Sequence, residues 1–426
     1  MTVESARSLA DELRRSWAQF DLDELTSDAV KYLTAGTPTD WGLPSNPPSR
    51  VPPITLGSGI PDPASLPREP LIEAMKRALD TVDDGPLRYG GGVGFEPLRA
   101  EIAARYTRDR GFPVTSDHFL LTNGSAGAID QVCAALISPG DIVITEAPTF
   151  SGSIRTFRGH QAEVHTVPMD NDGMQVEHLE PLIKRLHAEG RKVKVIYTIA
   201  SYHNPMGVTL AYERRVQLLQ IASRYGIFVI DDDAYGELYF DVDKKPTALS
   251  AMSECEGVIT VGTFSKVIAT GLRVGWIHAT PEVLDRVVRM RFEMGNSPLL
   301  HGMLYEFVKD GGLDRHLDHV RKIYRRKLEA LTAALHEYCE PYVTWRRPGG
   351  GFFLWVSLTN GLDARKVQAV AIEEGFVFPG GFAFFPDRID TGEHIRLAFS
   401  WASEDDLREA ARRLAKACEI VANGGG

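Results

Sequence analysis

One stretch of the chain combines a single lysine with donor groups of the kind that bind phosphate. The segment Val261–Trp276 carries Lys266, the hydroxyls of Thr263 and Ser265, and the guanidinium of Arg273. Apolar segments precede and follow it, so we expect Lys266 to lie in a buried turn. Burial lowers the pKa of an amine and makes it nucleophilic towards an aldehyde, with which it can form a Schiff base. These residues suit a phosphate-bearing aldehyde such as pyridoxal 5′-phosphate (PLP), although the stretch considered alone is also compatible with an ordinary surface loop.

Three carboxylates follow another apolar run. Asp231, Asp232 and Asp233 come directly after Val229 and Ile230, and Tyr235 follows two residues later. A divalent metal is one explanation, but successive strand residues point to opposite faces, and no other cluster of His, Asp or Glu completes an oxygen shell. One buried aspartate beside a protonated ring nitrogen explains the charge better, because that nitrogen then helps the ring to withdraw electrons. The hydroxyl of Tyr235 would reach the same ring.

Three further sites combine polar residues with strand ends. Ser125, Ala126 and Gly127 open a predicted helix, whose free N–H groups favour a phosphate, although Ser125 could also be a simple helix cap. Asn204 lies in an Asn-Pro-Met-Gly turn and could donate a hydrogen bond to a phenolic oxygen. Arg396 lies in a predicted strand, where its planar fork suits a carboxylate unless it is a surface residue.

The elements around these residues alternate between strands and helices from about residue 116 to residue 290. Most of the strands are nearly continuous apolar runs, which are typical of a parallel sheet buried on both faces. We expect a doubly wound α/β domain with a mostly parallel, seven-stranded sheet, in which ligands bind at the carboxyl ends of the strands. The predicted strands are Phe119–Thr122, Ile142–Glu146, Ala162–Val167, Val193–Thr198, Phe228–Asp231, Val258–Gly262 and Val274–Ala279.

The rest of the chain is predicted to form an arm and a smaller α+β domain. Residues 1–50 indicate a helix (Ser8 to Phe20) and a Pro/Gly-rich arm, in which Trp41 favours docking on another surface. Residues 51–85 would begin the small domain, residues 86–300 would form the PLP-binding large domain, and residues 301–426 would complete the small domain. The segment from 281 to about 338 is expected to be helical throughout. The glycine-rich run 90–94 lacks the spacing of a dinucleotide fingerprint.

Composition narrows the classes of function. No apolar run approaches the roughly 18 residues of a membrane span, and the first residues lack a signal-peptide core, so we expect a cytoplasmic protein without a membrane partner. Four scattered cysteines form no CxxC pair and favour a reducing compartment without a zinc site. The net charge of −10 disfavours a nucleic-acid partner.

Taken together, the motifs resemble those of the fold-type I PLP-dependent aminotransferases of class I/II. The resemblance is greatest to the branch that contains 2-aminoadipate, kynurenine and aromatic aminotransferases, and it runs from about residue 55 to about residue 417. It implies that Lys266 is the Schiff-base lysine, that Asp232 pairs with the pyridine nitrogen, and that Tyr235 and Asn204 bind the ring's 3′-oxygen. The implied phosphate ligands are Ser125, Ala126, Gly127, Thr263, Ser265 and Arg273.

The resemblance also assigns residues outside this cluster. Phe150 would stack on the cofactor ring, and Tyr89 would reach the phosphate of a partner subunit, which implies a homodimer with shared active sites. Arg396 would bind the α-carboxylate of the substrate, and Gly59 would line the substrate pocket with Asn204. The chain departs from many relatives at Ala126, Ala200 and Met206, which weakens any transfer of substrate identity.

The expected activity is transfer of an amino group between an L-amino acid and a 2-oxo acid, with Lys266, Asp232 and Tyr235 as the catalytic residues. The aromatic side chains Phe382, Phe384 and Phe385 favour an aromatic or long-chain substrate, unless they belong to the core. The same residues would serve a PLP-dependent decarboxylase, a C–S or C–O lyase, a cyclase or an oxidase. A PLP-binding regulator without catalysis is a further alternative, disfavoured by a short and acidic N-terminal extension.

Overall fold

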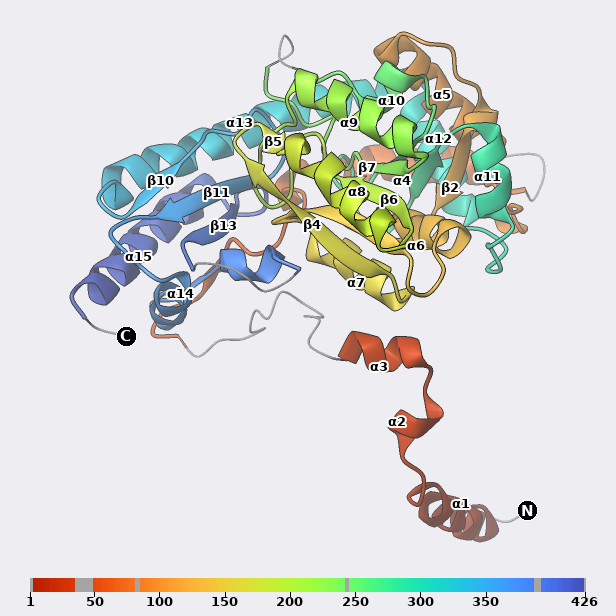
Figure 1. The fold of residues 1–426 in the computed structure, drawn as a ribbon, viewed down its shortest axis with the longest axis horizontal. Coiled ribbons are helices and arrows are strands. Elements are labelled where there is room, and N and C mark those ends of the chain that lie inside the picture. Colours follow the sequence, from red (N-terminus) through yellow and green to blue (C-terminus); the bar gives the residue numbers. More distant parts are fainter. Residues whose placement is uncertain (1–2, 35–48, 81–84, 242–244, 387–391, 425–426) are drawn as a thin grey trace.

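The computed structural model describes residues 3–34, 49–80, 85–241, 245–386 and 392–424 (Figure 1). Its largest sheet has eight strands in the order β2-β9-β8-β7-β6-β3-β4-β5. The strands β3, β4, β6, β7 and β8 are mutually parallel, and β9 runs antiparallel to both of its neighbours. The strands are β2 (Phe119–Thr122), β3 (Ile142–Ala147), β4 (Glu163–Asp170), β5 (Gly173–Met174), β6 (Val193–Thr198), β7 (Phe228–Asp232), β8 (Val258–Thr263) and β9 (Gly275–His278).

Alternate residues of the central strands belong to two different hydrophobic clusters. In β7, Val229 packs into one cluster and Ile230 into the other, and in β8 the neighbours Val258 and Ile259 are divided in the same way. Because successive strand residues point to opposite faces, both faces of the sheet are covered. This arrangement explains why the strands are apolar at nearly every position.

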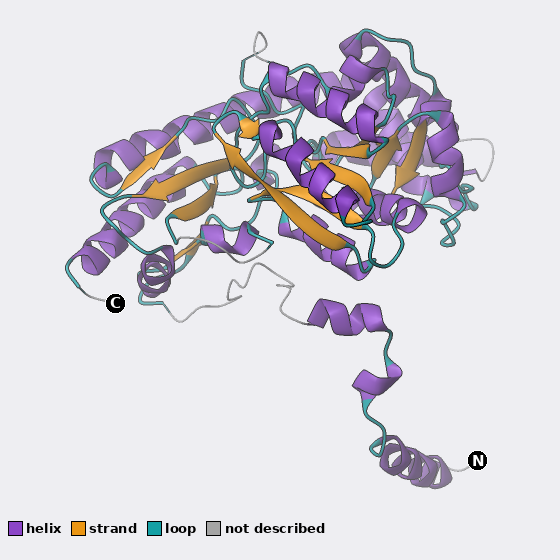
Figure 2. Cartoon of the chain, viewed as in Figure 1, coloured by secondary structure: helices purple, strands orange, loops and turns teal. Residues whose placement is uncertain are grey.

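Helices cover the two faces. The helices α8 (Leu179–Ala188) and α9 (Tyr212–Tyr225) supply the cluster that contains Val229 and cover the face turned towards the viewer in Figure 1. The helix α6 (Gly124–Leu136) supplies the other cluster through Ile129 and Val132. Figure 2 shows the same arrangement of strands enclosed by helices. The predicted α/β class and mostly parallel sheet are therefore confirmed, with all seven expected strands present and the two-residue β5 added at one edge.

A second, smaller sheet lies beside the first. It has the order β10-β11-β13 and is antiparallel throughout, with β10 at Val343–Trp345, β11 at Phe353–Leu358 and β13 at His394–Ala398. The helices α13 (Gly312–Cys339) and α15 (Glu404–Ala422) pack against one another beside this sheet (Figure 1). A short parallel pair joins β1 (Ile54–Thr55) to β12 (Phe376–Val377) and brings the chain after residue 49 to this sheet.

The expectation of an uninterrupted helical region after residue 281 is wrong. The helix α11 (Pro281–Val288) ends well before α12 (Pro298–Val308) begins, and Met294 and Gly295 between them have positive φ angles of 60° and 94°. A left-handed residue interrupts the helical hydrogen-bond pattern.

The N-terminal segment extends away from the sheets. The helix predicted from Ser8 to Phe20 is present as α1 (Val3–Trp17), followed by α2 (Leu22–Leu25) and α3 (Asp28–Thr34). Of these three helices, α3 lies near α7 (Ser151–Gly159), as Figure 1 shows. The predicted docking arm with Trp41 lies outside the described residues.

Candidate active site

Lys266 and Asp232 come from the ends of two neighbouring parallel strands. Asp232 ends β7 and is paired in register with Val261 of β8, and Lys266 follows the end of β8. The Lys266 amine donates a hydrogen bond to the carbonyl oxygen of Gly59, 2.7 Å away. Burial lowers the pKa of Lys266 to about 8, an effect that the charge of Asp232 partly opposes. The predicted dry, nucleophilic lysine is thus consistent with this environment.

Asp232 has one carboxylate oxygen engaged and one without a partner. Its Oδ2 accepts a hydrogen bond from the hydroxyl of Tyr197 at 2.8 Å, whereas its buried Oδ1 has no hydrogen-bond partner among the residues that the structure describes. Burial raises the pKa of Asp232 to about 6, and the hydrogen bond from Tyr197 counteracts this rise. A cationic N–H donor facing Oδ1 would satisfy the oxygen and stabilise the charged carboxylate.

The two aspartates beside Asp232 do not join it in one site. Asp233 accepts a hydrogen bond from Arg110 at 2.9 Å, and burial raises the pKa of Asp231 to about 7. In the described ranges, no group of three or more His, Cys, Asp or Glu side chains could hold a metal ion.

A turn rich in hydroxyls meets the N-terminus of α6. Arg273 donates hydrogen bonds to Ser265 Oγ at 3.4 Å and to the carbonyl oxygen of Asn123 at 3.3 Å. Thr263 donates in turn to Ser265 Oγ at 3.0 Å. Gly124 has a φ of +68°, and a Cβ there would lie 2.8 Å from Arg273 Nη2. The missing side chain therefore lets the guanidinium approach the helix N-terminus, where Ser125, Ala126 and Gly127 form the first turn. Such a concentration of N–H and O–H donors suits a phosphate.

Arg396 is buried against two aromatic rings. It is 1% exposed, and its guanidinium carbon lies 4.5 Å from the ring centre of Phe353 and 4.6 Å from that of Phe384. It donates a hydrogen bond to Asn204 Oδ1 at 3.0 Å and another to the carbonyl oxygen of Gly57. Burial lowers its pKa, so a carboxylate that pairs with it would restore the stability of the charged form. The alternative of a surface arginine is excluded.

Gly59 accepts the hydrogen bond from Lys266 and lies against the ring of Phe353. It is two residues from Gly57, which accepts a hydrogen bond from Arg396. A Cβ on Gly59 would come 2.4 Å from Phe353 Cζ, so only glycine leaves that ring in place. The segment is held from behind by Asp62, whose Oδ1 accepts a hydrogen bond from the buried ammonium of Lys327 at 2.8 Å. The backbone N–H of Ala398 also donates a hydrogen bond to the carbonyl oxygen of Leu56 at 2.8 Å, which fixes the start of the segment.

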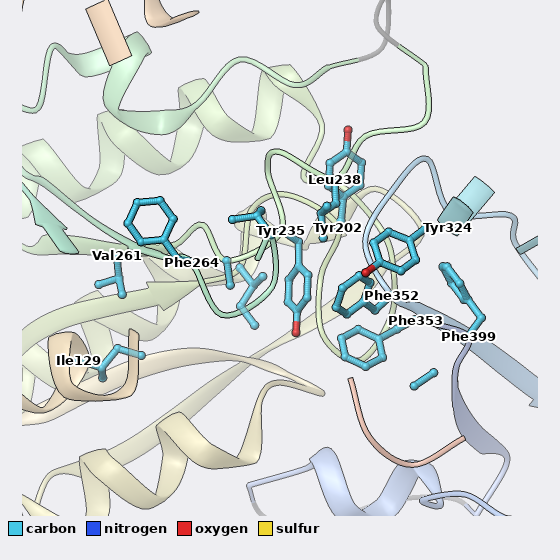
Figure 3. Close-up of a cluster of buried hydrophobic side chains, with 14 of the residues drawn as sticks. Ile129, Tyr202, Tyr235, Leu238, Val261, Phe264, Tyr324, Phe352, Phe353 and Phe399 are labelled. Carbon is cyan, nitrogen blue, oxygen red and sulfur yellow. The ribbon is translucent and has the colours of Figure 1, made fainter. Parts of the chain in front are cut away.

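Tyr235 stands beside the same aromatic cluster (Figure 3). Its ring makes edge contacts with Phe352 and Phe353 at centroid distances of 5.6 and 5.5 Å. Burial raises the pKa of the Tyr235 hydroxyl, so it stays protonated at neutral pH. Phe150 precedes α7 and accepts a backbone hydrogen bond from Ser153 at 3.2 Å.

Tyr89 is the one predicted site residue that the structure places away from this cluster. Its side chain is 86% exposed and borders a hollow with Leu87, Met294 and Pro298. The prediction assigned Tyr89 to the site of another subunit, so its exposure in a single chain is compatible with that assignment but does not test it.

Sequence reasoning overlooked several buried groups behind Asp232 and Asn204. Tyr197 donates to Asp232, as described above, and Ser153 donates to the Tyr197 hydroxyl at 2.8 Å. Beside Asn204, His203 Nε2 lies 3.4 Å from Glu146 Oε2, and both side chains are 1% exposed. Tyr197 and Glu146 lie in mostly apolar strands that also contain Thr145, Lys194 and Thr198, so the sequence pattern does not distinguish them.

Comparison with known proteins identifies the family. The model of the family described as aminotransferase class I and II matches residues 51–414. The chain belongs to this aminotransferase family. This aminotransferase is 34% identical to aromatic-amino-acid aminotransferase 1 of Thermococcus litoralis, over 85% of this chain and 87% of that protein. It is also 34% identical to the 2-aminoadipate transaminase of Thermus thermophilus, over 85% and 89% of the two chains.

Solved structures agree with this assignment. The multiple substrate aminotransferase of Thermococcus profundus has a TM-score of 0.85 and 28% identity to this aminotransferase, covering 95% of this chain and 100% of that one. The α-aminoadipate aminotransferase LysN of Thermus thermophilus, complexed with N-(5′-phosphopyridoxyl)-L-leucine, has a TM-score of 0.84 and 30% identity, covering 95% and 100%. The enzyme is therefore a PLP-dependent aminotransferase that acts on amino acids and oxo acids.

The described site fits this cofactor. The buried Oδ1 of Asp232, which has no partner among the described residues, suits the ring nitrogen, and the donors of Arg273, Ser265 and the first turn of α6 suit the phosphate. No described helix is both long and apolar enough to cross a membrane.

Proposed function

We propose that the aminotransferase moves an amino group between an L-amino acid with an aromatic or long side chain and a 2-oxo acid. The observation that carries this proposal is the convergence of Lys266 and Arg396 on one segment of the chain, with the carboxylate of Asp232 acting on Lys266. Lys266 and Arg396 donate to the carbonyl oxygens of Gly59 and Gly57, and the charge of Asp232 raises the pKa of Lys266.

The cofactor would be held at both ends by residues from different strands. Asp232 would bind the ring nitrogen through Oδ1, and Tyr235 and Asn204 would bind the 3′-oxygen. Phe150 would stack on the ring. The phosphate ligands would be Ser125, Ala126, Gly127, Thr263, Ser265 and Arg273. When bound, PLP supplies an aldehyde that takes up amino groups and a protonated ring that withdraws electrons from the substrate.

Lys266 would act as the acid and base of the transfer. Its pKa of about 8 leaves a neutral fraction at physiological pH, so the amine would accept the Cα proton of the substrate and deliver it to C4′ of the cofactor. The neutral form arises because the side chain is desolvated, and Arg396 and Arg273 reinforce the effect. Because one fixed amine would take the Cα proton, cleavage of the Cα–H bond would be favoured over loss of the carboxylate as carbon dioxide.

Arg396 would bind the α-carboxylate of the substrate. A bidentate contact with this buried guanidinium would keep the carboxylate on the amino acid and orient the Cα–H bond towards Lys266. The rings of Phe353 and Phe384 that flank Arg396 are each 1% exposed, so they belong to the core and hold the guanidinium in place. Phe382, in contrast, packs against Arg365, with 4.6 Å between the guanidinium carbon and the ring centre. The preference for an aromatic or long-chain substrate is supported by the relatives, an aromatic-amino-acid aminotransferase and a 2-aminoadipate transaminase.

The functional unit is proposed to be a homodimer with shared active sites. Large apolar side chains are exposed together near Tyr89, including Leu87 at 70%, Phe292 at 81% and Met294 at 60%. An exposed apolar patch of this kind marks an interaction surface, and a second copy would bring Tyr89 to the neighbouring phosphate site. Sedimentation analysis of the wild type and of Phe292→Ser tests this. The wild type should be dimeric, and the variant should already be monomeric at protein concentrations where the wild type is still a dimer. A wild-type monomer with full activity would contradict the shared site.

A half-reaction experiment tests the activity and the substrate class together. The PLP-loaded protein is mixed with one amino acid at a time, without an acceptor, and the absorbance of the bound cofactor is followed. Aromatic and long-chain amino acids should convert it fastest to the pyridoxamine phosphate form, and a 2-oxo acid should restore the original spectrum. Release of carbon dioxide, ammonia or peroxide without pyridoxamine phosphate would refute transfer, and equal rates with short polar amino acids would refute the substrate class.

A further inference from the structure

A chain of two hydroxyl groups ends on the carboxylate of Asp232. Ser153 Oγ donates to the hydroxyl of Tyr197 at 2.8 Å, and the Tyr197 hydroxyl donates to Asp232 Oδ2 at 2.8 Å. All three side chains are at least 95% buried, and Tyr197 is completely inaccessible. The two hydrogen bonds therefore follow one another: Ser153 orients the Tyr197 hydroxyl, and that hydroxyl donates to Asp232, in a setting where water does not compete.

The geometry of the sheet places Tyr197 and Asp232 on one face. Tyr197 of β6 is paired in register with Ile230 of β7, and Asp232 lies two residues further along β7. Residues two apart in a strand share a face, so the tyrosine ring extends along the sheet towards the aspartate. The ring is held by an edge contact with Phe157 of α7, at a centroid distance of 5.3 Å.

The same helix provides the second donor. Ser153 lies in the first turn of α7, three residues after Phe150, the residue proposed to stack on the cofactor ring. The position of α7 thus determines both the start of the hydroxyl chain and the position of Phe150. Asp232, at the other end, keeps Oδ1 for the cofactor because Oδ2 is already occupied.

The charges around Asp232 explain why it needs these donors. Asp233 and Glu146 are carboxylates that disfavour its ionisation, and Lys266 is the cation that favours it. Burial is the largest influence and raises the pKa to about 6, whereas the Tyr197 hydroxyl lowers it. A donor to Oδ2 therefore keeps Asp232 charged near neutral pH, the form required for pairing with a protonated ring nitrogen.

We propose that Tyr197, supported by Ser153, is a positioning residue that fixes the orientation and the charge of Asp232 for the cofactor. This inference rests on the proposed pairing of Asp232 with the ring nitrogen. Tyr197 itself would not touch the cofactor or the substrate. Its contribution would be seen in how tightly PLP binds and in how that binding depends on pH.

The test measures the dissociation constant of PLP with the cofactor-free protein, for the wild type and Tyr197→Phe. The variant keeps the buried ring and removes only the donor. Because a hydrogen bond to a charged group contributes roughly 1.5–3 kcal/mol, PLP binding near neutral pH should weaken about tenfold or more. The loss should shrink as the pH rises, since Asp232 then ionises without help. Ser153→Ala should shift the constant in the same direction by a smaller factor.

Tyr225→Phe is the matched control. The Tyr225 hydroxyl donates to Glu180 at 2.9 Å, the same kind of tyrosine-to-carboxylate contact between two surface helices. This variant should bind PLP like the wild type at every pH. An equal loss in Tyr225→Phe would show that the effect of Tyr197→Phe is general destabilisation and would overturn the proposal.

A double-mutant cycle with Asp232→Asn separates positioning from a packing role. In the Asp232→Asn background, Tyr197→Phe should change the PLP dissociation constant less than about twofold, because no charge remains to be stabilised. The same loss in both backgrounds would overturn the inference and leave the proposed site intact. If Asp232→Asn alone left PLP binding unchanged, the proposed pairing of Asp232 with the ring nitrogen would be refuted, and the inference about Tyr197 with it. If Tyr197→Phe did not fold, an unchanged dissociation constant in Ser153→Ala would refute the hydroxyl chain.

Discussion

Gly59→Ala is the substitution that most directly probes the substrate side of the site. The added Cβ would lie 2.4 Å from Phe353 Cζ and 2.8 Å from Cε1, whereas carbon atoms in contact are about 3.5–4.0 Å apart. The Phe353 ring must therefore move by about 1 Å. It has little room to do so, because Tyr235 makes an edge contact with it and Arg396 lies over its face.

Overpacking of this kind costs roughly 1–3 kcal/mol. We expect the displaced ring to shift Arg396, so that the α-carboxylate of the substrate binds less tightly. The KM for the amino acid should rise by about five- to a hundredfold, while the affinity for PLP should change little. Steady-state kinetics with saturating oxo acid, together with a PLP titration, separate the two effects.

Gly302→Ala is the control for adding a methyl group to a buried glycine. A Cβ at Gly302 would meet only Ala78 Cβ at 3.5 Å, an ordinary contact, and Gly302 lies within α12, where alanine is favourable. Its kinetics should match those of the wild type. If folded Gly59→Ala enzyme kept a KM within about twofold of the wild-type value, the placement of the α-carboxylate beside Phe353 and Arg396 would be wrong.

Two further predictions concern the phosphate site and acid stability. Gly124→Ala combines strain at a φ of +68° with a contact to Arg273 Nη2 at 2.8 Å, so PLP affinity should fall at least about tenfold. Gly111→Ala is the control: it has a φ of +78° and no atom within 4 Å of the added Cβ, so it should lose similar stability but keep PLP affinity. Burial lowers the pKa of His301 to about 4 from its ordinary 6.5. Between these two values the unfolded chain binds more protons than the folded chain, so the free energy of unfolding decreases as the pH falls from about 6.5 to about 4. Denaturant unfolding at about pH 7 and about pH 5 should show His301→Leu losing about 2 kcal/mol less than the wild type over this interval, and equal losses would contradict this role of His301.

The lysine, the aspartate and the arginine could be predicted because each stands out in its own stretch of sequence. Lys266 and Asp232 follow apolar strands, and the carboxyl ends of parallel strands meet at one edge of a sheet, so their proximity follows from the fold class. Arg396 interrupts an apolar strand. A charged residue between buried neighbours is itself a signal, and its complete burial agrees with that expectation.

Other parts of the site depend on contacts between distant segments. Gly59 and Phe353 are far apart in the chain, and no local pattern indicates that a glycine is needed to make room for that ring. The contact of Tyr197 with Asp232 depends on the register between β6 and β7, which neither strand specifies alone. The break after α11, in contrast, is predictable, because Gly295, Asn296, Ser297 and Pro298 form a run of residues that favour a turn.

The most direct test of the account is to locate the covalent attachment of PLP. The loaded protein is reduced with borohydride, which fixes the cofactor to the amine that holds it, then digested and examined by mass spectrometry. The phosphopyridoxyl group should be found on Lys266, and Lys266→Ala should carry none and lose turnover. A label on another lysine, or normal turnover by Lys266→Ala, would contradict the central claim.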